Sequence, residues 1–208
     1  DEFYNELVKR DLYESAEKIN DAYEILKNLS NEVEIIIFSA CVLKGQVAKS
    51  GRMFLNKYEY ILKNFDFIDP NNIVLGGNKS IISGEYFLDD KLENLECCNA
   101  KSKLLFTAYH NKNIPTEELL RKGILRINNY SELSDFITNK IADEKIDQIL
   151  KEYFEAVFDG KIIFHWYREG DWISLIVNDM HGRSFMIENE FYTQIEGLLG
   201  MPVYRMYT

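Results

Sequence analysis

Short hydrophobic runs alternate with amphipathic segments over the first two thirds of the chain. The runs are too short to be buried helices, and each ends in polar or turn-forming residues. Such runs are typical of strands that are buried on both faces of a parallel sheet. Strands are therefore expected at Glu34–Ser39, Ile73–Leu75, Tyr86–Leu88, Leu104–Phe106 and Ile124–Ile127.

The segments between these runs carry hydrophobic residues at three- and four-residue spacing, which predicts helices with one apolar face. The expected helices are Leu12–Leu29, Met53–Phe65, Glu117–Arg121 and Ser131–Ile141. Strands that alternate with helices predict a doubly wound α/β fold with a parallel sheet and right-handed crossovers.

From about residue 142 the pattern changes. Asp143–Phe158 predicts a strongly amphipathic helix. Tight glycine-containing turns then separate three expected strands, and a last helix follows. These are strands at Lys161–Tyr167, Trp172–Val177 and Arg183–Ile187 and a helix at Glu190–Leu199. We therefore predict an α/β core over residues 1–141 and a small appended α+β antiparallel meander over residues 142–208.

Polar side chains occur where the predicted parallel strands end. Ser39 ends the first strand, Lys79 follows the second, and Asp89–Asp90 end the third; Thr107 and His110–Asn111 follow the fourth. In an open α/β sheet the ligand crevice lies outside the carboxyl ends of the strands. A hydroxyl, a cation and two carboxylates at one crevice are suited to a phosphate group beside a divalent metal ion.

Each of these residues also has an ordinary structural interpretation. Ser39 could simply end a strand, and Lys79 could be a solvated loop residue. Asp89–Asp90 could cap a short following helix, because aspartate favours that position. The order of these groups on successive strands favours the site.

Composition narrows the class of function. The chain has 208 residues, of which 46% are hydrophobic and 28% charged, as in ordinary soluble globular proteins. No hydrophobic run could span a membrane, and there is no signal-peptide pattern. The net charge of -10 and the scattered basic residues argue against binding to a nucleic-acid backbone but permit a small phosphorylated ligand. Cys41 and the adjacent Cys97–Cys98 are expected to be free thiols in a reducing cytoplasm.

The strand-end residues resemble motifs two, three and four of the haloacid dehalogenase-like phosphatases, and within these the 5'(3')-deoxyribonucleotidase type. The resemblance covers roughly residues 11–129 and is most specific over residues 72–113. The segments that carry it are IIIFSA (Ile35–Ala40), KYEY (Lys57–Tyr60), NIVLGGNKSIISGEYFLDDKLEN (Asn72–Asn94) and LLFTAYHNKN (Leu104–Asn113). It implies a magnesium-dependent phosphomonoesterase that acts on nucleoside monophosphates.

The resemblance also implies a role for each residue. Ser39 and Ala40 would bind the phosphoryl oxygens, and Lys79 would neutralise charge on the phosphoryl group and the nucleophile. Asp90, alone or with Asp89, would bind Mg²⁺ if the site is intact, because this hard ion takes oxygen ligands. The metal and the lysine would stabilise the charge that develops in the transition state.

The sequence departs from the first motif of the family. That motif is an apolar strand followed by Asp-x-Asp, whose first aspartate accepts the phosphoryl group and whose second is the general acid; a helical cap separates it from the serine strand. Here 33 residues precede Glu34–Ser39, and their pattern is helical and polar. Phe3–Leu12 resembles at most the tail of a cap. The acceptor and the acid are therefore not where the family places them.

Three explanations stay open at this point. The N-terminal part has been deleted or cleaved, which the initial Asp1 allows. Alternatively, the protein is a non-catalytic relative that binds a protein partner or a second copy of itself through residues 142–208. In the third explanation the chain is permuted, with Asp179 as the nucleophile and His181 in the place of the acid; a hairpin turn at Met180–Gly182 accounts for the same stretch.

Overall fold

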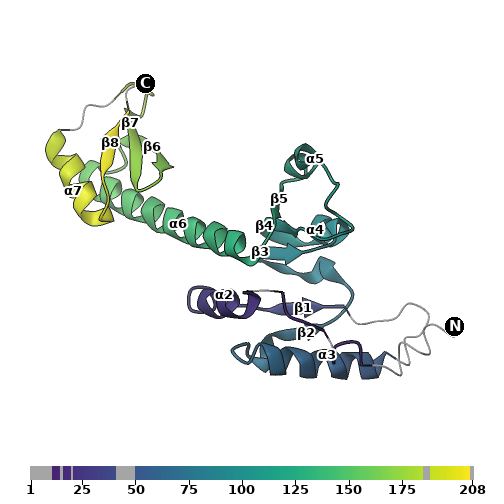
Figure 1. Ribbon diagram of the computed structural model, residues 1–208. Helices are drawn as coiled ribbons and strands as arrows, with labels where there is room; N and C mark the ends of the chain where they lie inside the picture. The colour runs from purple at the N-terminus through teal and green to yellow at the C-terminus, as the bar shows by residue number, and fades with distance from the viewer. Residues whose placement is uncertain (1–10, 15, 20, 41–49, 185–187, 207–208) are drawn as a thin grey trace. The chain divides into compact units, whose positions relative to one another are not determined.

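A computed structural model describes residues 11–14, 16–19, 21–40, 50–184 and 188–206. The chain divides into two compact units, residues 1–135 and 136–208, and the division falls inside the helix α6 (Tyr130–Phe158) (Figure 1). The predicted domain boundary at residues 141 and 142 lies further along the same helix. In the part of the chain that the structure describes, no helix is both long and apolar enough to cross a membrane.

The first unit contains two parallel sheets. β1 (Ile37–Ser39) pairs with β2 (Ile73–Leu75), so that Ser39 lies opposite Leu75. The other sheet has the order β3-β4-β5, and its strands are Ser83–Asp89, Asn99–Phe106 and Ile124–Ile127. The predicted parallel α/β architecture is confirmed, but the described strands form two sheets instead of one.

Helices of the first unit lie between these strands, as the alternating pattern predicts. They are α2 (Ala22–Leu29), α3 (Gly51–Asn64), α4 (Leu92–Cys97) and α5 (Thr116–Arg121), with single 3-10 turns at Pro70–Asn72 (η2) and Lys79–Ile81 (η3). α2 is shorter than predicted because Asp21, immediately before it, has a left-handed conformation with φ 63°, which interrupts a helix.

A hydrophobic core holds α4 and α5 against the sheet β3-β4-β5. Leu95 of α4, Leu105 of β4, Leu119 of α5 and Ile124 of β5 are at most 1% exposed. Burial of four such side chains contributes roughly 1.5–3 kcal/mol each relative to exposure. This packing fixes the carboxyl ends of β3 and β4, where the predicted site residues lie.

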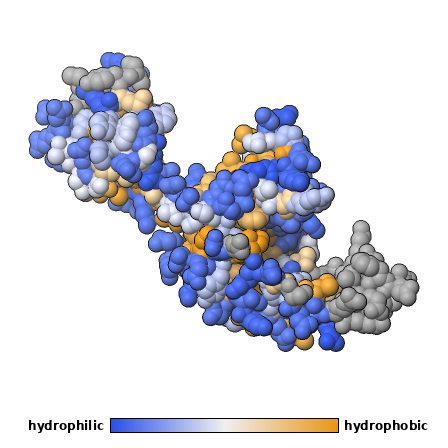
Figure 2. All heavy atoms as spheres, in the orientation of Figure 1, coloured by the Kyte–Doolittle hydropathy of each residue, from blue (hydrophilic) through white to orange (hydrophobic). Residues whose placement is uncertain are grey.

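The edges of β1 and β3 lie next to hydrophobic surface. Among the described residues, β1 pairs only with β2 and β3 pairs only with β4, so each keeps one edge without a described strand. Ile36, Val74 and Ile81 of this region are 57%, 38% and 66% exposed. Figure 2 shows hydrophobic surface on the first unit amid a mostly hydrophilic exterior.

The second unit is an antiparallel hairpin covered by helices. β6 (Ile162–Glu169) pairs with β7 (Trp172–Asp179), and β8 (Val203–Arg205) runs parallel to β7 on its other side. A continuous core joins the sheet to α6 and α7 (Asn189–Leu199). Its buried members are Ile146, Leu150, Phe154, Ile173, Leu175, Val177, Tyr192, Ile195 and Val203.

The appended α+β unit was predicted, but its details differ from the expected meander. The predicted strand Arg183–Ile187 is described only in part. Ser184 makes an isolated bridge to Asn178, and residues 185–187 lie outside the described ones. The third described strand is β8, which α7 returns to the sheet through a left-handed turn at Gly200. α6 is one helix and not two, because no glycine or proline interrupts it near Ala142.

Candidate functional site

Lys79 connects the two sheets of the first unit. It begins η3, just after β2, and is only 6% exposed. Its Nζ donates a hydrogen bond to the carbonyl oxygen of Phe38 in β1 and lies 3.8 Å from Oδ2 of Asp89 at the end of β3. The ammonium group therefore joins the carboxyl ends of β1 and β3, two strands that do not pair with each other.

The electrostatic environment of Lys79 is set by burial. Burial lowers the pKa of the ammonium group from its ordinary value, and the negative charge of Asp89 is the main influence in the opposite direction. The Nζ also lies 4.6 Å from the centre of the Phe38 ring. A cation that is shielded from water interacts more strongly with a nearby anion than a solvated one. Lys79 is thus a buried cation whose described charge partner is Asp89.

The carboxylate of Asp89 takes part both in the ion pair with Lys79 and in hydrogen bonds within the turn that follows β3. Its Oδ1 accepts hydrogen bonds from the backbone N–H of Lys91 at 2.9 Å and from Nδ2 of Asn94 at 3.0 Å. The side chain is 10% exposed. Asp89 does not cap α4 as the structural interpretation expects, because Lys91 is the N-cap residue, but its carboxylate orders the turn before that helix alongside its contact with Lys79.

Asp90 faces a different neighbour. Its carboxylate is 52% exposed, and Oδ2 lies 3.9 Å from Nε2 of His110. Nε2 of His110 also lies 2.9 Å from the backbone carbonyl oxygen of Asp90. The two adjacent carboxylates thus differ: Asp89 is buried against Lys79, and Asp90 is accessible to a ligand.

Asn111 fixes the position of Asp90. This side chain is 2% exposed, and its Nδ2 donates to the carbonyl oxygens of Asp90 and Phe106, each at 2.8 Å. Its Oδ1 accepts from the backbone N–H of Ala108 at 2.9 Å. Asn111 therefore ties the end of β3 to the end of β4. The sequence placed it near the crevice without assigning it a function.

Ser39 and Ala40 lie at the carboxyl end of β1. The carbonyl oxygen of Ser39 accepts a hydrogen bond from the N–H of Gly76 at 2.9 Å, and Ala40 is exposed. Ser39 is the residue directly after Phe38, whose carbonyl group binds Lys79. The structure thus brings Ser39, Lys79 and Asp89 to adjoining strand ends, while their roles toward a phosphate group stay predictions.

The acidic pair fits magnesium by the chemistry of its donors. In the described ranges, no group of three or more His, Cys, Asp and Glu side chains could hold a metal ion. Magnesium usually keeps several water ligands and binds proteins through one or two carboxylates. The exposed carboxylate of Asp90 can provide one of these. That of Asp89, already engaged with two N–H donor groups and the Lys79 cation, is the less accessible of the two.

Asp179 and His181, the candidates of the permuted arrangement, lie in a hairpin turn of the second unit. The Asp179 carboxylate accepts from the backbone N–H groups of His181 and Arg183 and from Nε of Arg183, at 2.9, 3.0 and 2.7 Å. Gly182 has φ 77°, as such turns require. The turn therefore accounts for these residues without a catalytic role.

The carboxyl ends of parallel strands, or the turns just after them, thus carry Ser39, the buried Lys79 and the aspartates Asp89 and Asp90, which is the polar edge of an α/β protein. A comparison with family models identifies the family. The model described as "5' nucleotidase, deoxy (Pyrimidine), cytosolic type C protein" matches residues 1–142, and the chain belongs to this family. The predicted kinship with haloacid dehalogenase-like deoxyribonucleotidases is therefore confirmed.

Individual relatives agree with the family. The chain is 39% identical over 92 residues to a putative 5'(3')-deoxyribonucleotidase of Staphylococcus epidermidis, which is 44% of the chain and 48% of that protein. It is 30% identical over 120 residues to a Staphylococcus aureus protein of the same name, or 58% and 59% of the two chains. A Bacillus subtilis 5'(3')-deoxyribonucleotidase is 28% identical over 123 residues, or 59% and 63%. The chain thus spans about half to three fifths of these relatives.

Proposed function

We propose that the protein is a phosphomonoesterase that releases phosphate from deoxyribonucleoside monophosphates in the cytoplasm. The observation that carries the proposal is the buried Lys79, whose ammonium group contacts the end of β1 and Asp89 at the end of β3. The family and the names of the relatives supply the substrate class. The free thiols of Cys97 and Cys98 are compatible with a reducing compartment.

In this proposal each residue acts on one part of the substrate. The hydroxyl of Ser39 and the backbone N–H of Ala40 bind phosphoryl oxygens, and Lys79 balances the charge of the phosphoryl group. Asp90, with Asp89 beside it, holds Mg²⁺, which stabilises charge on the phosphoryl oxygens when it is bound. Asn111 positions Asp90 by holding its carbonyl group. These groups orient the phosphate, but a carboxylate must still accept it.

We place the acceptor on a strand that pairs with the edge of β1 or β3. Both edges lack a described partner strand, and Lys79 bridges the ends of the two strands. A parallel strand on either edge would bring its carboxyl end to the position where Ser39 and Asp89 end their strands. An Asp-x-Asp sequence after such a strand would face the same phosphate. This segment belongs to the full-length gene product in the proposal.

The test is phosphate release by the full-length gene product. Deoxyribonucleoside monophosphates are supplied with magnesium, and a parallel reaction contains EDTA. The proposal expects turnover that stops on chelation and returns when magnesium is added. A folded full-length protein that releases no phosphate under these conditions would contradict it.

The second candidate is a non-catalytic relative that binds a protein partner or its own copy through residues 142–208. The observation that favours it is the second unit, which has its own core and lies almost entirely beyond the matched residues 1–142. This candidate predicts a folded full-length protein without magnesium-dependent turnover but with stable association.

A further inference from the structure

The sheet of the second unit has a long strand at its edge. β6 pairs with β7 along one side over all eight of its residues, and no described strand lies along its other side. An edge of this length presents unpaired backbone N–H and C=O groups that another strand can match. Half-buried and exposed residues alternate along β6, so its two faces have different environments.

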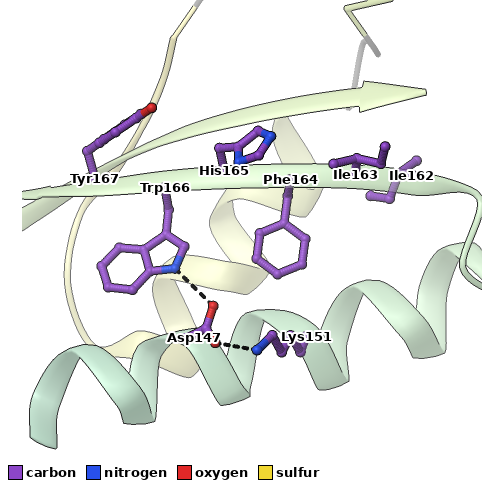
Figure 3. Close-up of a pocket in the computed structure, with 8 residues that line it drawn as sticks. All are labelled: Asp147, Lys151, Ile162, Ile163, Phe164, His165, Trp166 and Tyr167. Carbon is purple, nitrogen blue, oxygen red and sulfur yellow. Dashed lines mark hydrogen bonds and ion pairs between the residues drawn. The ribbon is translucent and has the colours of Figure 1, made fainter. Parts of the chain in front are cut away.

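A groove runs along this free edge. Its volume is about 440 Å³, and its walls are residues 162–167 of β6 together with Asp147 and Lys151 of α6. Six consecutive strand residues line it and no residue of β7 does, so it follows the side of β6 away from β7. Figure 3 shows Phe164 and Trp166 directed toward α6 and His165 and Tyr167 directed to the opposite face. Nε1 of Trp166 donates to Asp147 at 3.3 Å, which anchors β6 to the helix.

The exposed face of β6 carries opposite charges at its two ends. Lys161, Ile163, His165, Tyr167 and Glu169 are all exposed and alternate with half-buried residues. Ile163 and Tyr167 are 40% and 56% exposed. A cation and an aliphatic residue thus precede His165, and an aromatic residue and an anion follow it. When a second copy of the strand runs in the opposite direction, each cation faces an anion and each aliphatic residue faces an aromatic one.

We propose that two copies of this chain associate through their β6 edges, as an antiparallel strand pair with a two-fold axis at His165. In this register Lys161 lies opposite Glu169 of the second copy, and Ile163 lies opposite Tyr167. The symmetry produces each pair twice. Opposite-charge and aromatic–aliphatic pairs directly across a strand pair are stabilising. The result is one continuous sheet across both copies, and it does not depend on the proposed enzymatic activity.

Neighbouring registers lack this complementarity. Successive residues of a strand point to opposite faces of the sheet. The exposed faces of the two copies therefore lie on the same side only in registers that differ from one another by two residues. An axis at Phe164 places Lys161 opposite Tyr167 and Ile163 opposite His165 of the second copy, and it leaves Glu169 beyond the end of the second β6. An axis at Trp166 places Glu169 opposite the aliphatic Ile163. Only the axis at His165 pairs both the charges and the hydrophobic side chains.

A charge-swap experiment tests the interface on the whole chain. Sedimentation velocity over a range of concentrations gives the dimer dissociation constant of the wild type and of Lys161→Glu, Glu169→Lys and the double variant. Each single substitution creates two like-charge pairs and raises the constant about tenfold or more, and the double variant restores it because the pairs are reversed. Lys145→Glu, a reversal at an exposed position of α6, is the control and leaves the constant unchanged.

The register is tested by cross-linking in a background in which the three native cysteines are replaced by serine. His165→Cys places two thiols directly opposite each other, where strand Cα atoms are about 4.5–5.5 Å apart and a disulfide can form. Tyr167→Cys is the matched control, because its two copies are separated by four residues, or about 13 Å. The proposal expects an oxidised dimer for His165→Cys alone. Far-ultraviolet circular dichroism verifies that each variant is folded.

Two outcomes overturn the proposal. A wild-type chain that sediments as a monomer at all concentrations up to about 100 μM has no β6 dimer. A dimer whose dissociation constant is the same in the wild type and both charge-reversal variants uses another surface.

Discussion

The two units of the molecule differ in the kinds of side chain that they bury. In the first unit the buried residues include the polar side chains of Ser50, Lys79 and Asn111, and two of these hold the ends of parallel strands together. In the second unit Ser174 is the one buried polar residue described, and an all-hydrophobic core joins helices to a hairpin. Parallel strands gather their polar groups at one edge, whereas a hairpin sheet directs them to its outer face. The first arrangement favours a ligand site and the second an association surface.

The largest expected effect comes from removing the buried cation of the first unit. Lys79→Met in the full-length protein keeps much of the side-chain volume and eliminates the charge beside Asp89. Loss of one group that stabilises transition-state charge costs about 10²–10³ in catalytic rate. We expect a decrease of that size in kcat for phosphate release.

Lys101→Met is the matched control for this prediction. Lys101 lies on β4 of the same unit, but its side chain is 77% exposed and forms a surface ion pair with Glu85. We expect its kcat to stay within about twofold of the wild type, because surface ion pairs contribute little. Equal activity of the Lys79→Met protein and this control would remove Lys79 from the proposed mechanism.

The same comparison shows what sequence patterns can and cannot predict. β4 and β5 were predicted from their hydrophobic runs, and in β4 the successive residues Leu104 and Leu105 are buried on both faces of the strand. The contact of Lys79 with the carbonyl group of Phe38 was not, because periodicity does not specify which strands are neighbours. β8 was missed because Val203–Arg205 ends in a charged residue and is not a continuous hydrophobic run. α6 was divided because its hydrophobic positions do not stay on one face along its length.

The second prediction separates the stabilities of the units. Leu150→Ala removes a fully buried side chain from the core of the second unit, and Leu105→Ala does the same in the first. Each substitution costs about 2–5 kcal/mol of unfolding free energy in its own unit. Both tryptophans, Trp166 and Trp172, lie in the second unit. Tryptophan fluorescence in a denaturant titration therefore follows the second unit, and far-ultraviolet circular dichroism follows both.

In this experiment Leu150→Ala lowers the midpoint of the fluorescence transition, and Leu105→Ala leaves it unchanged while it shifts part of the circular dichroism transition. If Leu105→Ala shifted the fluorescence midpoint as much as Leu150→Ala does, the units would unfold as one cooperative body. The contrast between the two kinds of core would then have no thermodynamic counterpart.

A smaller effect is expected at the polar connection between β3 and β4. Asn111→Ala removes a 2% exposed side chain whose amide donates to the carbonyl oxygens of Asp90 and Phe106 and accepts from the N–H of Ala108. Unsatisfied buried groups cost about 1–3 kcal/mol. We expect this loss in the unfolding free energy of the first unit, measured by circular dichroism. Asn113→Ala, at an exposed position nearby, should change it by less than about 0.5 kcal/mol. Equal stability of the two variants would show that Asn111 is not a structural connection.

The smallest expected effect is a pH dependence in the turn after β7. Hydrogen bonds from Arg183, the backbone N–H foremost, lower the pKa of Asp179 from its ordinary value of 3.8. Because the folded pKa is the lower one, the ionised carboxylate stabilises the turn above pH 3.8, and this contribution is lost as the pH falls through the folded pKa. The amide resonance of Arg183, followed by NMR, should therefore titrate below pH 3.8, and Asp179→Asn should abolish the titration. A midpoint above pH 3.8 would contradict the prediction, because it would mean that the folded turn does not favour the ionised carboxylate. The backbone N–H groups of His181 and Arg183, on either side of Gly182, would then not stabilise the charge of Asp179.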